Sequence, residues 1–340
     1  MKGVSVEKRI TMAHGSGGRA TQRLIEEIFA PRFRNAVLAR MNDAALLDVE
    51  GGRLALATDG HVVSPLFFPG GDIGRIAICG TVNDLAMMGA RPRWLTLSFV
   101  LEEGLPLADL ERIADSMAQA AEEAGVQIVA GDTKVVERGH GDGLYVSAAG
   151  VGIVPPGVEV EAANARPGDV LLINGPVGNH GITLMLQREG LHFDAPLESD
   201  AAPLNHIVAA LLEAAPHTHT LRDATRGGLA TALNEIAQTA EVGIVVEEAA
   251  VPVDEAVRGA CGLLGLDPLY VANEGVFVAF VPPEEAEAAL AAMRAHPLGR
   301  RARRIGQVVA DHAGQVVLAT ALGAERILPP LSGNLLPRIC

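Results

Sequence analysis

The sequence predicts an α/β protein built from two domains, and three observations support this. The chain has 340 residues, more than the roughly 100–200 residues of one ordinary domain. Runs with the apolar spacing of strands alternate with runs of helical spacing along both halves. A stretch rich in proline and glycine at residues 154–169 separates the halves and is typical of a domain junction. We therefore expect domains at residues 1–157 and 158–327, followed by a tail at 328–340.

In the first half, a glycine-rich turn at residues 14–18 leads into an amphipathic helix at 19–30, which Pro31 ends. Further helices are expected at 73–88 and 107–124. Strands are expected at 53–58, 94–101, 126–130 and 144–153.

The second half continues the pattern without a short-period repeat. Its predicted strands are residues 170–173, 242–247, 269–271, 275–281, 302–309 and 315–319. Its predicted helices are residues 181–188, 201–214, 229–239 and 284–295.

Composition excludes several classes of protein. Lys and Arg total 27 against 41 Asp and Glu, a net charge of −14, and aromatic residues are only 3% of the chain. The chain therefore has few basic residues to neutralise phosphates and few aromatic residues to stack on bases, so nucleic acid is a poor candidate partner. No run approaches the roughly 18 apolar residues of a membrane span, and the first eight residues lack the apolar core of a signal peptide. We expect a cytoplasmic protein with no membrane partner.

The three cysteines, Cys79, Cys261 and Cys340, are an odd and scattered set, which argues against a disulfide framework or a zinc site. Cys340 is the last residue of a tail that holds three prolines and one glycine. Such a tail favours an extended, mobile chain that could span roughly 40 Å. A terminal cysteine by itself is more often incidental than functional.

Five aspartates lie in predicted turns or at predicted strand ends: Asp43, Asp59, Asp84, Asp132 and Asp223. Each one alone is explained by ordinary turn chemistry. Asp59 and Asp132, however, each follow an apolar strand run, and the strand ends of an α/β sheet converge on one crevice. Carboxylates gathered there would repel one another unless a hard cation such as Mg²⁺ joined them to phosphate oxygens.

Phosphate-binding motifs of the two common nucleotide folds are missing. The Gly15–Gly18 and Gly227–Gly228 segments each precede a predicted helix and offer backbone N–H groups to an anion, although glycine is common at such places. His14 and His61 lie in glycine-containing loops, where contact with a nucleotide and a plain surface role are equally open.

Two single residues stand out. Glu274 interrupts an apolar strand run; it is either a bulge or edge residue with a solvated carboxylate, or a desolvated group whose raised pKa suits a proton acceptor. Lys134 is the one lysine beyond the first eight residues. A general bias towards arginine explains that pattern, and so does a need for a compact cation beside Asp132.

Taken together, the motifs identify a family. "HGSGGRAT", "ATDGHVVSPLFFPGGDIG", "VNDLAMMGA", "AGDTKVV", "DATRGGLA", "NEG" and the terminal "PRIC" closely resemble the HypE family of carbamoyl dehydratases, which mature nickel-iron hydrogenases. That family belongs to a superfamily of ATP-using enzymes with aminoimidazole ribonucleotide synthetase and selenophosphate synthetase. The resemblance implies a two-domain aminoimidazole ribonucleotide synthetase-like fold, α/β in the first domain and α+β in the second, with a flexible C-terminal tail.

The resemblance also implies a site. ATP would lie near the junction of domains and of the two subunits of a homodimer, under a loop that includes His14, Gly15, Gly17 and Gly18. Mg²⁺ and the phosphates would be held by Asp43, Asp59, Asp84 and Asp223, with Arg226 in the same motif as Asp223. Asp132 and Lys134 would sit near the transferred phosphoryl group.

The implied chemistry gives the terminal cysteine a role. A HypF-type carbamoyltransferase would load a carbamoyl group onto Cys340, ATP would phosphorylate its oxygen, and loss of phosphate would leave a thiocyanate. Glu274 and Lys134 are the candidate bases for the two nitrogen protons. Arg338 is expected to offset charge at the thiolate. A HypC–HypD complex would accept the cyanide.

Two alternatives stay open. A sister synthetase such as selenophosphate synthetase would need a reactive cysteine near the N-terminus, and the first cysteine, Cys79, falls inside a predicted helix where burial is expected. An adaptor that docks a partner through its tail would not need ATP hydrolysis at all.

Overall fold

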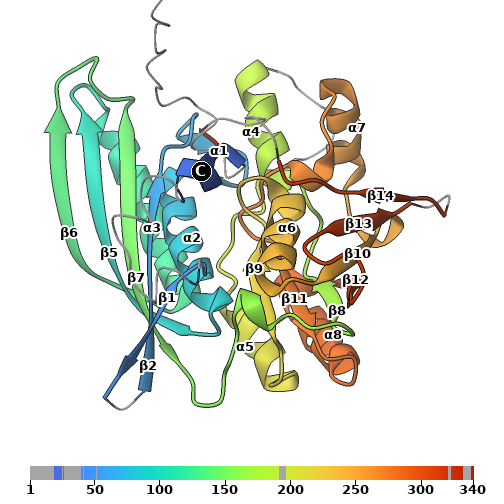
Figure 1. The fold of residues 1–340 in the computed structure, drawn as a ribbon. Coiled ribbons are helices and arrows are strands. Elements are labelled where there is room, and N and C mark those ends of the chain that lie inside the picture. The colour runs from blue at the N-terminus through green and yellow to red at the C-terminus, as the bar shows by residue number, and fades with distance from the viewer. Residues whose placement is uncertain are drawn as a thin grey trace, which may run out of the picture.

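Two sheets, one in each half of the chain, organise the structure (Figure 1). A computed structural model describes residues 19–24, 26, 40, 42–50, 52–190, 197–320, 323–331 and 338–340. A short helix, α1 (Arg19–Leu24), precedes the first sheet.

The first sheet has five strands within the described residues, in the order β1-β2-β7-β5-β6. The strands are β1 (Ala45–Val49), β2 (Gly52–His61), β5 (Arg91–Glu102), β6 (Gln127–Val136) and β7 (Leu144–Val154). Only the β5–β6 pair is parallel among them. This order puts β6 at an edge, because β7 and β5 lie between it and β2.

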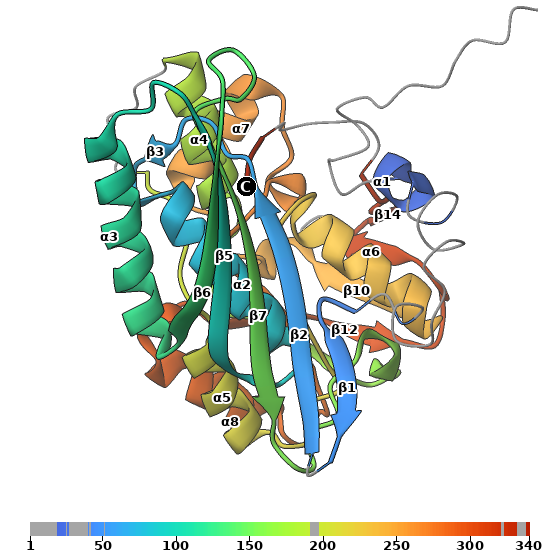
Figure 2. The same ribbon diagram turned by 90° about the vertical axis from the view of Figure 1, so that its left-hand side faces the viewer.

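One face of this sheet is covered and the other is not. Helix α2 (Ile73–Met87) packs on the inner face, and α3 (Leu107–Ala124) packs beside it. No described helix lies over the outer face, which is the side nearest the viewer in Figure 2. Large apolar side chains are exposed there or along the β6 edge, among them Leu56, Trp94, Ile128, Val129, Val135 and Ile153. An uncovered apolar face of this kind is typical of surfaces that take part in association.

The second sheet has seven strands in the described part of the chain, in the order β14-β13-β10-β12-β8-β11-β9. They are β8 (Val170–Ile173), β9 (Thr220–Asp223), β10 (Gly243–Glu247), β11 (Phe277–Val281), β12 (Arg303–Val309), β13 (Val316–Ala319) and β14 (Glu325–Ile327). The helices of this half are α4 (Asn179–Glu189), α5 (Asn205–Ala214), α6 (Gly228–Ala240), α7 (Glu255–Leu264) and α8 (Ala286–Ala295).

Side chains of β8 and β11 alternate between the two faces of this sheet, as a strand requires. Leu171, Val278 and Phe280 join the apolar cluster under α6. Their neighbours Leu172 and Ala279 join the cluster under α5 and α8. Both faces are therefore buried, which explains why these strands are continuous apolar runs in the sequence.

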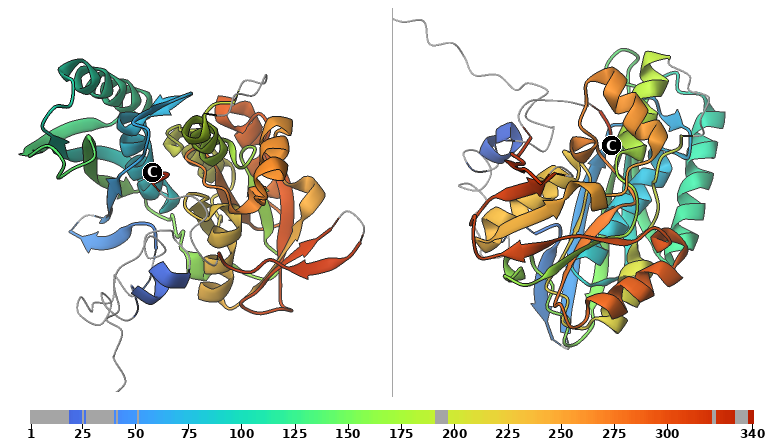
Figure 3. Two further views of the ribbon diagram at one scale, coloured as in Figure 1. Left: turned by 90° about the horizontal axis from the view of Figure 1, so that it is seen from above. Right: turned by 90° about the vertical axis from the view of Figure 1, so that its right-hand side faces the viewer.

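Helix α2 joins the two halves. All of its residues except Arg75 and Asp84 are buried, and its N-terminus is capped by the Asp72 carboxylate, which accepts from the Arg75 N–H at 3.0 Å. Its last turn, Ala86 and Met87, packs with α5 in the second half. Seen from above in Figure 3, the C-terminus of the chain lies between these halves.

The sequence predicted several elements closely. The helix at 107–124 and the strand at 170–173 have the expected bounds. Residues 269–271 were expected to form a strand, which is wrong: Pro268–Tyr270 is a turn of 3₁₀-helix that begins with proline and is capped by Asp267. The strand at 126–130 extends further than expected, to Val136. Among the strands and helices that were not predicted are β1, β9, α7, β14 and the two short strands β3 (Phe67–Phe68) and β4 (Gly71–Asp72), which pair with each other.

The Gly227–Gly228 pair has a structural reason. Both residues have positive φ, 78° and 63°. A Cβ on Gly228 would lie 2.6 Å from the carbonyl oxygens of Leu269 and Val271. The Gly228 N–H donates to the Thr225 carbonyl at 2.9 Å. This N–H therefore closes a turn and is not available to an anion, contrary to what its position before a helix suggested.

We predict opposite effects for two glycine-to-alanine substitutions. G228A should lower the free energy of unfolding by about 1–3 kcal/mol, because the new Cβ meets backbone oxygens at a left-handed φ. G262A, in helix α7 with open space around its Cα, should raise it by about 0.5–1 kcal/mol. Denaturant titration of both variants measures the two values. Equal effects of the same sign would contradict the close approach at Gly228.

Candidate functional site

Three carboxylates from distant parts of the sequence meet at the junction of the two halves. They belong to Asp43 just before β1, Asp84 in α2 and Asp223 at the end of β9. One oxygen of each lies within 4.8 Å of the others, and among the described residues this is the one group of three such side chains placed to hold a metal ion. Hard carboxylate oxygens at this spacing suit Mg²⁺.

Burial and mutual repulsion shift the pKa values of this triad upward. Burial raises the pKa of Asp223 to about 8, and the charges of Asp43 and Asp59 add to the shift. The pKa of Asp84 is raised well above its ordinary value by burial and by Asp223, Asp59 and Asp43. Burial also raises the pKa of Asp43, to about 6, although Arg222 opposes this. The triad therefore has a strong electrostatic affinity for a cation.

Arg222 is a neighbour that the sequence did not single out. Its Nη1 lies 2.7 Å from Asp43 Oδ1, and its Nη2 pairs with Glu235 on α6. The guanidinium therefore supplies positive charge to the triad and ties β9 to α6. The residue precedes Asp223 in the motif, but no pattern in the sequence distinguishes it from the other arginines.

Asp59 lies near the end of β2, beside His61. The His61 ring is buried, and its Nε2 lies 3.2 Å from Asp59 Oδ2 without a well-aligned hydrogen bond. Burial would raise the pKa of Asp59, but contacts with His61 and the charge of Arg226 outweigh it and lower the pKa to about 2. Helix α2 approaches this pair through Gly80, whose absent Cβ would lie 3.2 Å from His61 Nε2. His61 is thus a buried residue of the site rather than a surface one.

The last three residues of the chain are docked between the halves. A backbone oxygen of Cys340 accepts from the Val62 N–H at 3.0 Å, and the Arg338 carbonyl accepts from the Ser64 N–H at 3.3 Å. Ile339 is buried. The composition of the tail predicted mobility, and these contacts give its end a specific docked position.

The Cys340 thiol lies in an electrostatic environment shared with the predicted catalytic residues. Burial raises its pKa to about 12, although the residue keeps some contact with solvent; Arg226 lowers the pKa, and Glu274, Asp59 and Asp223 raise it. The Arg226 side chain is exposed. A negative charge on Cys340 is the largest cause of the raised pKa of the Arg226 guanidinium. Arg226 is therefore a cation within electrostatic reach of the sulfur. Arg338, expected in that role, instead pairs with Asp142.

Glu274 is buried rather than solvated, which decides between its two interpretations. Its pKa is raised well above the ordinary value by burial and by the charges of Asp59, Asp200 and Asp223, against the effect of Arg226. Asp200, which the sequence did not indicate, accepts the backbone N–H groups of Glu274 at 3.3 Å and Gly275 at 3.2 Å. Glu274 is thus a buried carboxyl group with a held backbone, and its charge reaches the Cys340 sulfur.

Asp132 and Lys134 lie elsewhere. They sit in the middle of β6, not after a strand, and pair with each other at 2.7 Å with both side chains more than 60% exposed. Across the sheet, Asp132 pairs with Ser98, Ser98 with Ser147, and Ser147 with Gly60, the residue after Asp59. These three steps between strands separate Asp132 from Gly60 by roughly 14 Å. The expectation that Asp59 and Asp132 converge within one chain is wrong, because strand order is not evident from the sequence.

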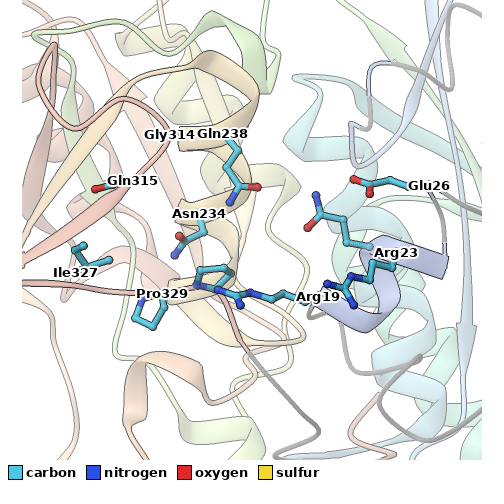
Figure 4. Close-up of a pocket in the computed structure, with 11 residues that line it drawn as sticks. Arg19, Arg23, Glu26, Asn234, Gln238, Gly314, Gln315, Ile327 and Pro329 are labelled. Atoms are coloured by element: carbon cyan, nitrogen blue, oxygen red, sulfur yellow. The ribbon is translucent and has the colours of Figure 1, made fainter.

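The predicted nucleotide loop with His14, Gly15, Gly17 and Gly18 lies outside the described residues. Next to it in the sequence, α1 borders a polar pocket of about 380 Å³ that reaches β14 and α6 (Figure 4). Arg19, Arg23 and Gln238 are among its lining residues. None of the predicted site residues that the structure describes lines this pocket, so it is separate from the carboxylate triad.

Comparisons with known proteins cover almost the whole chain. Residues 41–154 match the family model "AIR synthase related protein, N-terminal domain", and residues 166–319 match "AIR synthase related protein, C-terminal domain". Carbamoyl dehydratase HypE of Cupriavidus necator is 56% identical over 333 residues, which are 98% of this chain and 95% of that protein.

Two solved structures are also similar. The crystal structure of a HypE–HypF complex contains a chain with a TM-score of 0.87 and 47% identity, covering 91% of this chain and 99% of that one. The crystal structure of the hydrogenase maturation protein HypE in complex with ATP has a TM-score of 0.83 and 52% identity, covering 98% and 100%. Separately, no described helix is both long and apolar enough to cross a membrane.

We predict that D84N stabilises the metal-free protein, and more so as the pH rises. The native Asp84 carboxyl keeps its proton at a pH where the same carboxyl in the unfolded chain, with its ordinary pKa of 3.8, has lost it. Stability of the unsubstituted chain therefore falls as the pH rises from 3.8 towards the native pKa, by about 1.4 kcal/mol for each unit by which the pKa is raised. Asparagine does not titrate and removes this loss.

Thermal melting at pH 5 and pH 8 tests this prediction, with D115N on the exposed face of α3 as the matched control. The gain of D84N should be larger at pH 8, and added Mg²⁺ should stabilise the unsubstituted chain but not D84N. A gain that is equal at the two pH values would contradict the raised pKa.

Proposed function

The chain belongs to the HypE family of carbamoyl dehydratases, and from this premise we propose that it dehydrates a carbamoyl group carried on the Cys340 thiol to a thiocyanate, with ATP as the second substrate. One observation carries the proposal for this chain in particular. The terminal thiol is docked within the electrostatic reach of Arg226, Glu274 and Asp59, at the junction of the two halves. A carrier thiol must reach such a place for its cargo to react.

The reaction divides into two steps that balance. In the first, the carbamoyl oxygen attacks the γ-phosphorus of ATP, ADP leaves, and one N–H proton is taken up by a base. In the second, the C–O bond breaks, phosphate leaves with that oxygen, the other N–H proton is removed, and the S–C≡N group forms. Together, thiocarbamate and ATP give thiocyanate, ADP, phosphate and a proton.

Glu274 is the proposed base for the carbamoyl nitrogen. Its burial and its high pKa make it a strong proton acceptor once it is ionised. Arg226, whose charge reaches the sulfur, is the proposed cation for the phosphates of ATP.

Asp43, Asp84 and Asp223 are the residues that would hold Mg²⁺, with Asp59 beside them. Mg²⁺ there would neutralise charge on the phosphates and on these carboxylates, which also lowers the pKa of Glu274 towards ionisation.

Asp132 and Lys134 have a place in this proposal only if the chain forms a homodimer. Both are exposed on β6, whose outer edge is unpaired in the described chain. We propose that β6 and the outer face of the first sheet pair with a second copy, so that Asp132 and Lys134 act near the transferred phosphoryl group of the partner subunit. The exposed apolar side chains Trp94, Val129 and Val135 support such an interface.

Partners and location follow from the family. We propose a HypF-type carbamoyltransferase as the source of the carbamoyl group, in line with the similar chain in the HypE–HypF complex, and a HypC–HypD complex as the cyanide acceptor. The three free cysteines support a reducing, cytoplasmic location. A selenophosphate synthetase is less well supported, because Cys79 is fully buried and burial raises its thiol pKa to about 12.

We predict that E274Q accepts the carbamoyl group but dehydrates it about 10²–10⁴-fold more slowly, the usual contribution of a general base. Incubation with the carbamoyltransferase, carbamoyl phosphate and ATP, followed by intact-mass measurement, distinguishes the loaded tail from the tail that has lost water. C340A should show no adduct, and C261A should behave like the unsubstituted chain. Dehydration by E274Q at the unsubstituted rate would remove Glu274 from the mechanism.

We predict that V135K on the β6 edge weakens self-association by at least about tenfold, because it places an unpaired charge in the proposed interface. Sedimentation velocity over a concentration series measures the change. L107K is the matched control, since Leu107 is also exposed but lies on α3. A dimer of unchanged strength in V135K would show that copies of the chain associate through another surface.

A further inference from the structure

The docked end of the chain is held mainly through its backbone. Residues 338–340 run beside residues 62–64, with hydrogen bonds from the Val62 N–H to Cys340 and from the Ser64 N–H to Arg338. The Arg338 side chain donates a hydrogen bond from Nε to the Val62 carbonyl at 3.2 Å. These contacts leave the carbonyl of Ile339 on the other side of the tail.

His180, in α4 of the second half, contacts that carbonyl. Its Nε2 lies 2.7 Å from the Ile339 oxygen, and its Nδ1 lies 2.8 Å from the Ser199 hydroxyl oxygen. A carbonyl oxygen only accepts, so Nε2 carries the proton and Nδ1 accepts from Ser199. The imidazole is fully buried, and burial lowers its pKa to about 4, so it is neutral at physiological pH. Both ring nitrogens are therefore used.

The Ile339 side chain strengthens the same docking. It is buried in the apolar cluster of the first half together with Leu184 of α4 and Ala272. Arg188, one turn further along α4 than Leu184, donates to the Arg338 carbonyl. Helix α4 thus contacts the tail through three successive turns.

One carboxylate connects His180 to the proposed base. Asp200 accepts the backbone N–H groups of Glu274 and Gly275, and the backbone of His180 lies near enough to lower the Asp200 pKa. The backbones of His180 and Glu274 therefore lie against a common carboxylate. A tail seated on His180 is consequently seated at a fixed position relative to Glu274.

We propose that His180 is a positioning residue for the docked tail. Its Nε2–H bond to the Ile339 carbonyl fixes the position at which Cys340 is presented to Glu274. The identity of the group delivered rests on the proposed function, whereas the docking itself does not. His180 touches neither the sulfur nor ATP in this role, and acts through the penultimate peptide.

Two substitutions of the same chemical kind isolate this bond in the full-length protein. H180Q places an amide nitrogen near the position of Nε2 and can still donate to Ile339. H180N ends near the position of Nδ1 and cannot reach it. H206L is the control, because His206 also contacts a backbone carbonyl, that of Glu123, but far from the tail.

Two readouts separate the outcomes. The rate at which a small thiol reagent modifies Cys340, followed by peptide mass, reports docking without ATP or a transferase. H180N should raise this rate about tenfold, as expected for one net hydrogen bond, and H180Q and H206L should leave it near the unsubstituted value. After loading, H180N should lose water about tenfold more slowly, with an unchanged KM for ATP.

Equal thiol reactivity in H180N and H180Q would overturn the proposal. So would slower dehydration in H180N with unchanged protection of Cys340, because the effect would then not pass through the tail. If the unsubstituted loaded chain never loses water, the proposed function fails, while the thiol measurement still decides the role of His180.

Discussion

The site depends on the packing of one helix, α2, between the two halves of the chain. Its burial on nearly every side fixes Asp84 within 4.8 Å of carboxylates from β9 and from the approach to β1. Such a cluster is electrostatically unfavourable by itself, so the packing of the surrounding apolar residues must hold it together. Asn83, the neighbour of Asp84, donates to the carbonyls of Ala202 and Glu274 at 3.2 and 3.3 Å. The same helix therefore positions the triad and the proposed base.

Much of the fold could be predicted because its signals are local. The 107–124 helix has a regular apolar stripe and ends at Gly125, whose φ of 68° suits glycine. Buried strands such as β8 are short apolar runs between turn residues. Asp43, Asp84 and Asp223 were chosen from motifs, and the structure brings them together. The prediction of a strand at 269–271 is wrong because three apolar residues after a proline fit a 3₁₀ turn equally well.

The remaining site residues could not be predicted because their roles arise from contacts between distant segments. Asp200 matters through the N–H groups of Glu274 and Gly275, and His180 through the carbonyl of Ile339, 159 positions away. Neither residue lies in a motif that the sequence singles out. Asp132 was misplaced for a related reason, since β7 and β5 come between its strand and β2 only in the folded sheet. The tail is a similar case, because its composition describes the free chain and not its docking surface.

The electrostatics of the docked thiol suit a carrier that is loaded elsewhere. Burial, with the charges of Glu274, Asp59 and Asp223, disfavours a thiolate, which is why the Cys340 pKa rises to about 12. A carbamoylated sulfur has no proton to lose and carries no charge, so it does not incur this penalty. Under the proposed function, the chamber therefore favours the loaded tail over the thiolate, and the nucleophilic thiolate must form where the tail is undocked. A terminus that can leave the chamber meets both requirements with one cysteine.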